Sequence, residues 1–359
     1  MIEQIDLPAH PRILVVALRR LGDVLLTTPL IRSLRRTWPL AKIDILVFSD
    51  TAAILEGNPD IDDVLSAPSR RNALRSVTLA ARLWRKYDLA VTTQAGDRPT
   101  FLAAIAGRKR VGPVENRLIG RIKQLLLDRH IPMGEGVHRV DDVLSLARVL
   151  GVPPVAEVIC PRPAPRPDLM PSKPYAVIHA APMFRYKQWH ANGWRAVASH
   201  LAAQGLAVVV TGGPGEAERH YLDEVWRDTD VLRLDGKVTW PELTAVLAGA
   251  RVFLGPDTSV THLAAAAGAP TVALYGPTDP RLWGPWPASG LDAPWDAAAA
   301  SQQRGNVWLV QNPLPCQPCQ HEGCLRNLQS FSRCLDELGP EAVIAALNMA
   351  LTSGQRRQI

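Results

Sequence analysis

The stretch that decides the fold is RRLGDVLLTTP at residues 19–29, which follows the apolar run Ile13–Leu18 and opens an apolar-periodic segment. This pattern predicts a strand, a tight turn and a helix start, with the carboxylate of Asp23 at the turn. The layout recurs in VFLGPDTSVTH at residues 252–262, where Asp257 takes the place of Asp23. Ligands of open α/β sheets bind at such strand–helix turns. The repetition predicts two similar domains with a cleft between them.

Length, composition and charge narrow the class of protein. A chain of 359 residues favours two domains, and 47% hydrophobic with 21% charged residues is an ordinary globular composition. The net charge of +6 favours an acidic partner. Because the common nucleic-acid signatures are missing, we expect a small anionic ligand or an anionic lipid headgroup and no nucleic acid. No apolar run is long enough to cross a bilayer and no secretory signal is evident, so we expect a cytoplasmic protein.

Strand and helix patterns alternate in both halves of the chain, which predicts parallel sheets covered by helices. We expect one helix from Asp23 to about Trp38, and loop over residues 282–303. Prolines cluster between Gly151 and Pro174 and predict a semi-rigid linker. The expected segments are an N-terminal domain, a C-terminal domain and a terminal helix that packs back on the N-terminal domain, at residues 1–165, 166–335 and 336–359.

Asp23 has two interpretations. An aspartate before a helix is a common N-cap, and this residue taken by itself favours that interpretation. The alternative is a general base aimed into the cleft. Gly22 permits a tight turn and close approach of a ligand, and Arg19 and Arg20 are suited to an anionic acceptor.

Asp257 raises the same choice, because it is a natural N-cap for a helix over residues 258–267. The start of that helix offers backbone N–H groups and the hydroxyls of Thr258 and Ser259, a combination that binds phosphate. His262 lies one turn further on the same face as Thr258. A structural histidine and a ligand contact are about equally expected there.

Two further segments carry candidate residues. GGPGE at residues 212–216 follows a strand and begins a helix, so Glu216 is a candidate partner for ribose hydroxyls, although an acid in a first helical turn is also simply favourable. Arg185 and Lys187 follow another strand and are candidates for neutralising a diphosphate leaving group. The dinucleotide glycine fingerprint and the P-loop are both missing, which disfavours NAD-dependent dehydrogenases and P-loop NTPases.

Four cysteines near the C-terminus follow a C-x2-C-x4-C-x9-C pattern: Cys316, Cys319, Cys324 and Cys334. Such spacing suits structural zinc in principle, but it matches no common zinc module, and cytosolic thiols often stay reduced. We therefore predict no metal from the sequence and leave pairing, zinc binding and free thiols open.

Taken together, these motifs resemble glycosyltransferase family nine, the lipopolysaccharide heptosyltransferases, and are most similar to the branch called heptosyltransferase III. The resemblance covers nearly the whole chain in the right order. Each motif is weak alone, but the set is specific. The matching segments are GDVLLTTP at 22–29, KQW at 187–189, GGPGE at 212–216, Asp257-Thr258 with His262, YGPTD at 275–279 and LWGPW at 282–286.

The resemblance implies a glycosyltransferase B fold, with two Rossmann-like domains facing across a cleft. The N-terminal domain would bind the acceptor, the phosphorylated inner core of lipopolysaccharide, at the inner face of the inner membrane. The C-terminal domain would bind the donor, ADP-L-glycero-β-D-manno-heptose. The implied reaction is inverting and needs no metal or other cofactor, and the protein would contact the membrane peripherally.

Site residues follow from the same resemblance. Asp23 would be the base, and Lys187 would stabilise the departing ADP. Glu216 would hold the ribose and Val238 would lie against the adenine. The remaining donor contacts would be Arg185, Asp257, Thr258, Ser259 and His262, and the acceptor contacts would be Arg19, Arg20 and Gly22.

This chain departs from the family pattern at two places. Residues 181–184 are apolar where many members carry a phosphate-binding Thr or Ser, and Ser259 stands where many have glycine. The alternatives are a transferase or epimerase for another nucleotide-sugar, or a non-catalytic binding protein with the same fold.

Overall fold

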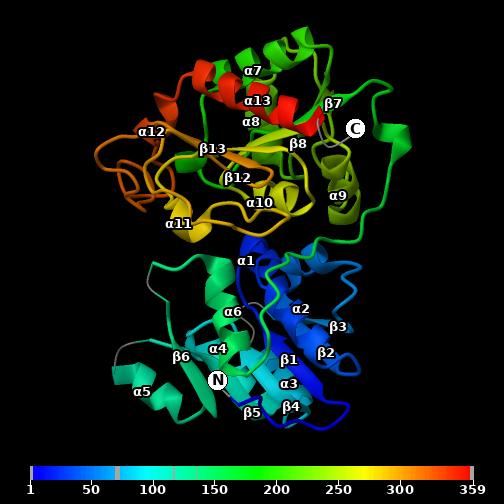
Figure 1. The fold of residues 1–359 in the computed structure, drawn as a ribbon, viewed down its shortest axis with the longest axis vertical. Coiled ribbons are helices and arrows are strands. Elements are labelled where there is room, and N and C mark those ends of the chain that lie inside the picture. The colour runs from blue at the N-terminus through cyan, green and yellow to red at the C-terminus, as the bar shows by residue number, and fades with distance from the viewer. Residues whose placement is uncertain (1–2, 69–72, 116–117, 135, 356–359) are drawn as a thin grey trace. The chain divides into compact units, whose positions relative to one another are not determined.

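The computed structural model describes residues 3–68, 73–115, 118–134 and 136–355. It divides into two compact units, Met1–Pro161 (unit 1) and Arg162–Ile359 (unit 2). The division lies in the proline-rich linker, a few residues before the expected boundary at 165/166. Each unit is built around its own sheet with helices packed on it (Figure 1).

Among the described residues, unit 1 forms a six-stranded parallel sheet in the order β3-β2-β1-β4-β5-β6. Residues 13–16 of β1 are fully buried, because a parallel strand covered by helices buries both faces. The strand order reverses between β1 and β4, so the crevice at their carboxyl ends is the topological switch point, where α/β sheets bind ligands. The strands are β1 (Arg12–Val16), β2 (Lys42–Phe48), β3 (Asp63–Ala67), β4 (Tyr87–Thr92), β5 (Gly107–Val114) and β6 (Arg129–Pro132).

The helix expected from Asp23 to Trp38 is two helices, α1 and α2, which corrects the prediction. Pro29 stands at the start of α2, and its ring would clash with the carbonyl of Leu25 if one helix ran through. The helices of unit 1 are α1 (Leu21–Leu25), α2 (Thr28–Thr37), α3 (Ala73–Leu83), α4 (Asp97–Ala106), α5 (Leu118–Gln124) and α6 (Arg139–Val149), with a 3-10 helix at Ser49–Leu55.

Within the described ranges, unit 2 forms a seven-stranded sheet in the order β12-β13-β11-β10-β7-β8-β9. Only the β12–β13 pair is antiparallel among the described pairings. Here the order reverses between β7 and β10, which gives unit 2 a switch point equivalent to that of unit 1. The strands are β7 (Tyr175–His179), β8 (Ala207–Thr211), β9 (Leu232–Arg233), β10 (Val252–Pro256), β11 (Thr271–Tyr275), β12 (Ser301–Arg304) and β13 (Val307–Gln311).

The C-terminal helix α13 belongs to unit 2. Val343, Ala346, Leu347 and Ala350 are fully buried in the core of unit 2, and the helix packs on α7, β10, β11 and β13. Its apolar face is therefore satisfied within unit 2. The helices of unit 2 are α7 (Ala191–Ala203), α8 (Glu216–Val225), α9 (Trp240–Ala248), α10 (Ser259–Ala266), α11 (Pro280–Trp283), α12 (Arg333–Asp336) and α13 (Pro340–Gln355), with 3-10 helices at Pro167–Leu169 and Arg185–Lys187.

The proline-rich linker begins as an extended strip that is hydrogen-bonded to unit 1. The N–H groups of Val155 and Ile159 donate to Ser33 Oγ and Thr28 Oγ1, both at 2.8 Å. Shortly afterwards the N–H of Ala164 donates to the carbonyl of Pro241 in unit 2 at 3.0 Å. The linker pairs with no described strand here, so its backbone N–H groups are satisfied by side-chain hydroxyls of α2 instead.

Candidate active site

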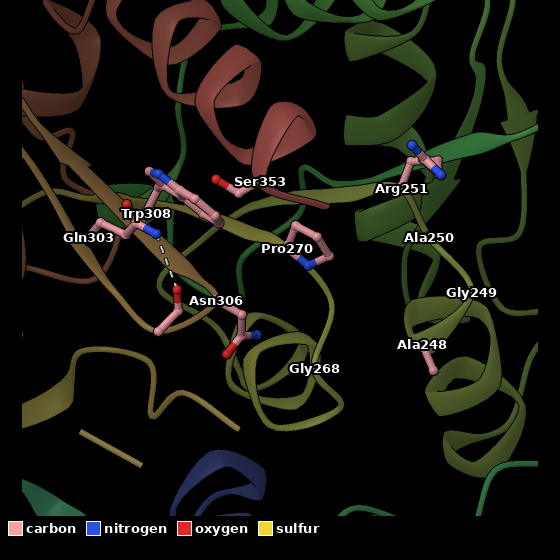
Figure 2. Close-up of a pocket in the computed structure, with 11 residues that line it drawn as sticks. Ala248, Gly249, Ala250, Arg251, Gly268, Pro270, Gln303, Asn306, Trp308 and Ser353 are labelled. Carbon is pink, nitrogen blue, oxygen red and sulfur yellow. Dashed lines mark hydrogen bonds between the residues drawn. The ribbon is translucent and has the colours of Figure 1, made fainter. Parts of the chain in front are cut away.

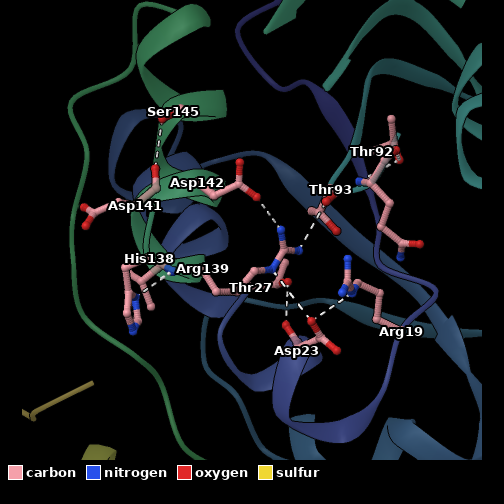
Figure 3. A network of polar contacts seen from close by, with 12 residues as sticks. Arg19, Asp23, Thr27, Thr92, Thr93, His138, Arg139, Asp141, Asp142 and Ser145 are labelled. Carbon is pink, nitrogen blue, oxygen red and sulfur yellow. Dashed lines mark hydrogen bonds and ion pairs between the residues drawn. The ribbon is translucent and has the colours of Figure 1, made fainter. Parts of the chain in front are cut away.

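Asp23 lies at the switch point of unit 1, just beyond the carboxyl end of β1. It is the third residue of α1, and Arg20 is the N-cap, so the prediction that Asp23 caps the helix is wrong. Its carboxylate is instead engaged by arginines (Figure 3). Arg19 Nε lies 2.8 Å from Asp23 Oδ1, and Arg139 Nε lies 3.9 Å from the same oxygen. A carboxylate between two cations is held in one orientation.

Arg139 is the residue of this site that the sequence analysis did not single out. It begins α6 and is only 6% exposed, with its guanidinium donating to Asp142 at 2.6 Å and to the carbonyl of Thr93 at 3.2 Å. Burial, and next the charge of Arg19, hold the pKa of Arg139 below its ordinary value. The sequence feature that could have identified Arg139 is its place in the first turn of a helix, where the macrodipole disfavours a cation.

Arg139 also ties Asp23 to the second strand of the switch point. Thr93 follows β4 directly, and its N–H donates to the carbonyl of Val16 at the end of β1. The guanidinium therefore spans from the end of β4 to the carboxylate that follows β1. Of the expected acceptor contacts, Arg19 takes part in this network, while Arg20 is exposed beside it and Gly22 is the second residue of α1.

Lys187 and Asp257 meet at the switch point of unit 2, although they are far apart in sequence. Lys187 Nζ lies 2.5 Å from Asp257 Oδ2, with exposed side-chain fractions of 20% and 9%. Lys187 comes from the loop after β7, and Asp257 follows β10, the two strands between which the order reverses. The loop is fixed by Trp189, which is fully buried and donates to the carbonyl of Leu338 at 2.8 Å.

Asp257 is surrounded by groups that favour its charged form. Burial raises the pKa of this carboxyl, but Lys187, His262 and the hydroxyl of Thr278 together hold it below its ordinary value. His262 Nε2 lies 4.0 Å from Asp257 Oδ1 and the ring is 5% exposed. The pair places one lysine ammonium at the carboxyl edge of the sheet, where an anionic ligand group would meet it.

Helix α10 begins one residue later than expected. Its N-cap is Thr258, whose hydroxyl accepts the N–H of Thr261 at 3.4 Å, so the expectation that Asp257 caps this helix is wrong. Asp257 is turned to Lys187 instead. Ser259 is the first helical residue, and both it and Thr258 are partly exposed. The helix start therefore retains N–H groups and hydroxyls of the kind that bind phosphate.

The remaining predicted donor residues lie at the same edge of unit 2. Glu216 begins α8 after β8 with an 85% exposed side chain, and Val238 is partly buried in the turn before α9. Arg185 is exposed at the start of the 3-10 helix that carries Lys187. A neighbour not predicted, Glu218, accepts the N–H of Gly213 at 2.6 Å and shapes the glycine-rich turn.

A cavity of about 260 Å³ lies elsewhere in unit 2 (Figure 2). Its lining includes Arg251 and Pro270, which precede β10 and β11, together with Asn306 and Trp308. It therefore opens at the amino ends of these strands, the edge away from Asp257. Nothing in the predicted site overlaps it.

No group of three or more His, Cys, Asp or Glu side chains among the described residues is arranged to hold a metal ion. None of the described helices has both the length and the apolar character of a membrane-spanning segment.

Comparison with known proteins identifies the family. The model of glycosyltransferase family 9 (heptosyltransferase) matches residues 77–326, well over half of the chain. The chain belongs to glycosyltransferase family 9. Among curated family 9 relatives, lipopolysaccharide heptosyltransferase 3 of Escherichia coli is 30% identical over 286 residues, covering 74% of this chain and 83% of the relative. Lipopolysaccharide heptosyltransferase 1 of Pseudomonas aeruginosa is 26% identical and covers 95% and 98%.

Solved structures confirm the glycosyltransferase B fold of this family 9 enzyme. A family 9 glycosyl transferase from Veillonella parvula matches with a TM-score of 0.77 and 19% identity over 98% of this chain and 100% of the other. An Escherichia coli heptosyltransferase solved with ADP matches with a TM-score of 0.71 and 21% identity over 94% and 99%. The prediction of a family 9 glycosyltransferase is confirmed.

Proposed function

We propose that this enzyme transfers heptose from ADP-L-glycero-β-D-manno-heptose to the inner core of lipopolysaccharide, with inversion at the anomeric carbon. The observation that carries the proposal is the charge arrangement at the two switch points. Unit 1 presents a carboxylate, Asp23, and unit 2 presents a cation, Lys187, at the equivalent place. One suits proton removal from an acceptor, and the other suits stabilisation of a diphosphate.

Asp23 acts as the general base in this proposal. As the acceptor oxygen bonds to the anomeric carbon, its proton passes to Asp23 and the bond from that carbon to the diphosphate oxygen breaks. The anomeric carbon passes through an oxocarbenium-like state. A single displacement of this kind inverts the configuration. Arg19 and Arg139 hold the carboxylate in position, which a base needs before the acceptor arrives.

Unit 2 would hold the donor by its charged and polar ends. Lys187 neutralises the diphosphate as negative charge develops, aided by the N–H groups and hydroxyls of Thr258 and Ser259 at the start of α10. Asp257 fixes the ammonium, and Arg185 and His262 lie beside the same edge. The exposed carboxylate of Glu216 is placed after β8 to meet the ribose, and Val238 offers an apolar contact to the adenine.

The acceptor side matches a phosphorylated glycolipid. The exposed Arg20 and the partly exposed Arg19 lie next to Asp23 and suit the phosphates of the core. Exposed apolar side chains gather along α5 and the segment after it, at Ile122, Leu125 and Met133. We propose that this segment supports peripheral contact with the inner membrane, where such an acceptor is anchored.

Titration calorimetry with ADP-heptose tests the donor, with GDP-mannose, UDP-glucose and NAD as controls. We expect selective binding of ADP-heptose, weakened in Lys187→Ala and unchanged in Asp23→Asn. Preference for another nucleotide-sugar would discard the heptose donor, and binding of none of them would favour a non-catalytic protein.

Turnover tests the base and the reaction type. Acceptor-dependent release of ADP should fall about 10² to 10⁴-fold in Asp23→Asn. ADP release without acceptor consumption would point to an epimerase or hydrolase instead. A variant that binds donor and turns over normally would refute the role of Asp23.

The membrane proposal needs its own variants. Ile122→Ser with Leu125→Ser should reduce sedimentation with anionic phospholipid vesicles. The matched control is Val77→Ser, which removes another apolar side chain of unit 1 that is 68% exposed. Equal loss in both proteins, or no loss, would refute a specific contact through α5.

A further inference from the structure

Residues 312–332, between β13 and α12, carry three of the four C-terminal cysteines and have no described helix or strand. The fourth, Cys334, is the second residue of α12. An irregular segment of this length inside a compact unit needs something besides backbone ladders to hold it. The family 9 reaction as proposed makes no use of these thiols.

The first part of this segment is tied to the turn that follows β11. Gln317 Nε2 donates to the carbonyl of Gly276 at 2.7 Å, and the N–H of Gln320 donates to the carbonyl of Pro277 at 2.8 Å. These two residues flank Cys319, and Cys316 immediately precedes Gln317. The chain that carries the C-x2-C pair is thereby tied to the turn at residues 276–277.

Cys334 reaches the same turn from the other end of the segment. A Cβ placed on Gly276 would lie 3.4 Å from Cys334 Sγ, so this sulfur packs directly on the glycine. Cys334 is 7% exposed. The same Cβ would lie 2.8 Å from the side chain of Leu335, so the turn is closely packed by these two residues of α12.

Cys324 is joined to Cys334 by its own hydrogen bonds. Its N–H donates to the carbonyl of Phe331 at 2.9 Å, and its Sγ accepts the N–H of Arg333 at 3.4 Å. These bonds close the loop from 324 to 333 and bring Cys324 next to Arg333, the residue before Cys334.

The two ends of the cysteine-bearing segment lie near one another. Cys334 lies at the same end of the segment as Cys324, whose sulfur accepts the N–H of Arg333, the residue just before Cys334. All four are free thiols in the structure, with no disulfide between them.

We propose that Cys316, Cys319, Cys324 and Cys334 bind one thiophilic divalent cation, zinc or iron(II), in a closed structural site. On binding, the thiols lose their protons to solvent and four sulfur–metal bonds form, with no change of oxidation state. The thiols stand near one another but not yet at ligand geometry, since no finished metal group occurs among the described residues. Closure requires rotation of the exposed Cys316 and Cys324 side chains towards Cys334.

The position of the site gives it a role in the enzyme. The turn on which the cysteines gather leads directly to Thr278, whose hydroxyl bonds to Asp257. A cation there would brace the carboxyl edge of unit 2 without contacting the donor. Four protein ligands leave no open position, which is the arrangement of structural rather than catalytic sites.

The test uses the full-length, untagged chain. Metal content is measured by mass spectrometry on protein purified with and without oxygen, and iron(II) is distinguished from zinc by its identity and by thiolate-to-iron absorption. Metal-free protein is then prepared with a chelator under reducing conditions and titrated with cobalt(II). We expect one equivalent of metal per chain and cobalt–thiolate charge-transfer bands that zinc abolishes.

Variants make the assignment specific. Cys319→Ser and Cys324→Ser should lose the stoichiometric metal and the cobalt bands, while Cys160→Ser, which alters the cysteine outside the pattern, should retain both. Iodoacetamide should label the four thiols only after chelation, a readout on the wild-type chain that does not depend on any variant folding. Absence of stoichiometric metal with no cobalt bands, bands retained in both variants, or disulfides among the four cysteines in protein isolated without oxygen would each overturn the proposal.

Discussion

Replacing Lys187 with methionine should destabilise unit 2 by about 3 kcal/mol, because the change leaves the buried carboxylate of Asp257 without its cation. Opposite charges 2.5 Å apart attract by roughly 7 kcal/mol at an effective dielectric constant of about 20. The cost of taking both charges out of water offsets much of this, and removal of one partner of a buried pair typically costs about 3–5 kcal/mol. Because the lysine side chain is 20% exposed, we expect the lower end of that range.

Urea unfolding followed by tryptophan fluorescence measures the loss, since Trp189, Trp194 and other buried tryptophans lie in unit 2. Lys173→Met, which alters an exposed lysine, is the matched control and should change stability by less than about 0.5 kcal/mol. Adding Asp257→Asn to Lys187→Met should restore most of the loss, because the unpaired charge is gone. A loss below about 1 kcal/mol, or a double variant as unstable as the single, would refute the reasoning.

The same pair has a pH signature. The folded-state pKa of Asp257 lies below the ordinary 3.8, so its contribution to stability is present above that pH and is lost as the pH falls through the folded value. The gap between wild type and Lys187→Met should therefore narrow in acid. A gap that stays constant down to pH 3 would contradict the assignment.

Three further outcomes are expected. Arg139→Met should lower turnover about a hundredfold without changing ADP-heptose affinity, because Asp23 loses its alignment. Arg139→Lys should recover part of the turnover. Weakened donor binding in Arg139→Met would contradict this prediction. Thr28→Val should cost about 1–3 kcal/mol in urea unfolding, since the N–H of Ile159 loses its acceptor, and an unchanged stability would refute that bond. Burial lowers the pKa of His179 to about 4, so wild-type stability should fall by about 3 kcal/mol between pH 6.5 and 4 as the unfolded state alone gains a proton. His179→Asn should remove that slope.

Most of the fold was predictable because long apolar strands and their following turns carry strong local signals. Residues 13–16 and 252–256 are buried on both faces of parallel sheets, and such strands are continuous apolar runs. Strands β5, β6, β12 and β13 were missed, and β12 begins inside the loop expected over residues 282–303. The reason is clearest for β5 and β12. The first holds Gly107 and Pro113, and the second is SQQR, a polar edge strand whose only described partner is β13. Neither has the alternation or apolar run from which strands are predicted.

The candidate site was predictable where residues follow strands and unpredictable where they meet through packing. Asp23, Lys187 and Asp257 each stand in a recognisable turn. Arg139 approaches Asp23 from a helix that begins more than a hundred residues later, and only the topology of the sheet brings it there. The expected N-caps failed for a related reason. Local rules assign an aspartate to the nearest helix start, but a nearby cation in the folded protein attracts it more strongly.

The linker's hydrogen bonds leave only a short stretch of chain unattached between the two units. The chain is fastened to unit 1 as late as Ile159 and to unit 2 as early as Ala164. Between these points Pro161 and Pro163 have fixed φ, and the residue before each is confined to extended conformations. Few torsions in this stretch keep a wide range, because the φ of each proline is fixed and the residues Cys160 and Arg162 before them are held extended. The covalent connection between the two units is therefore a stiff stretch of a few peptides with a restricted set of backbone conformations.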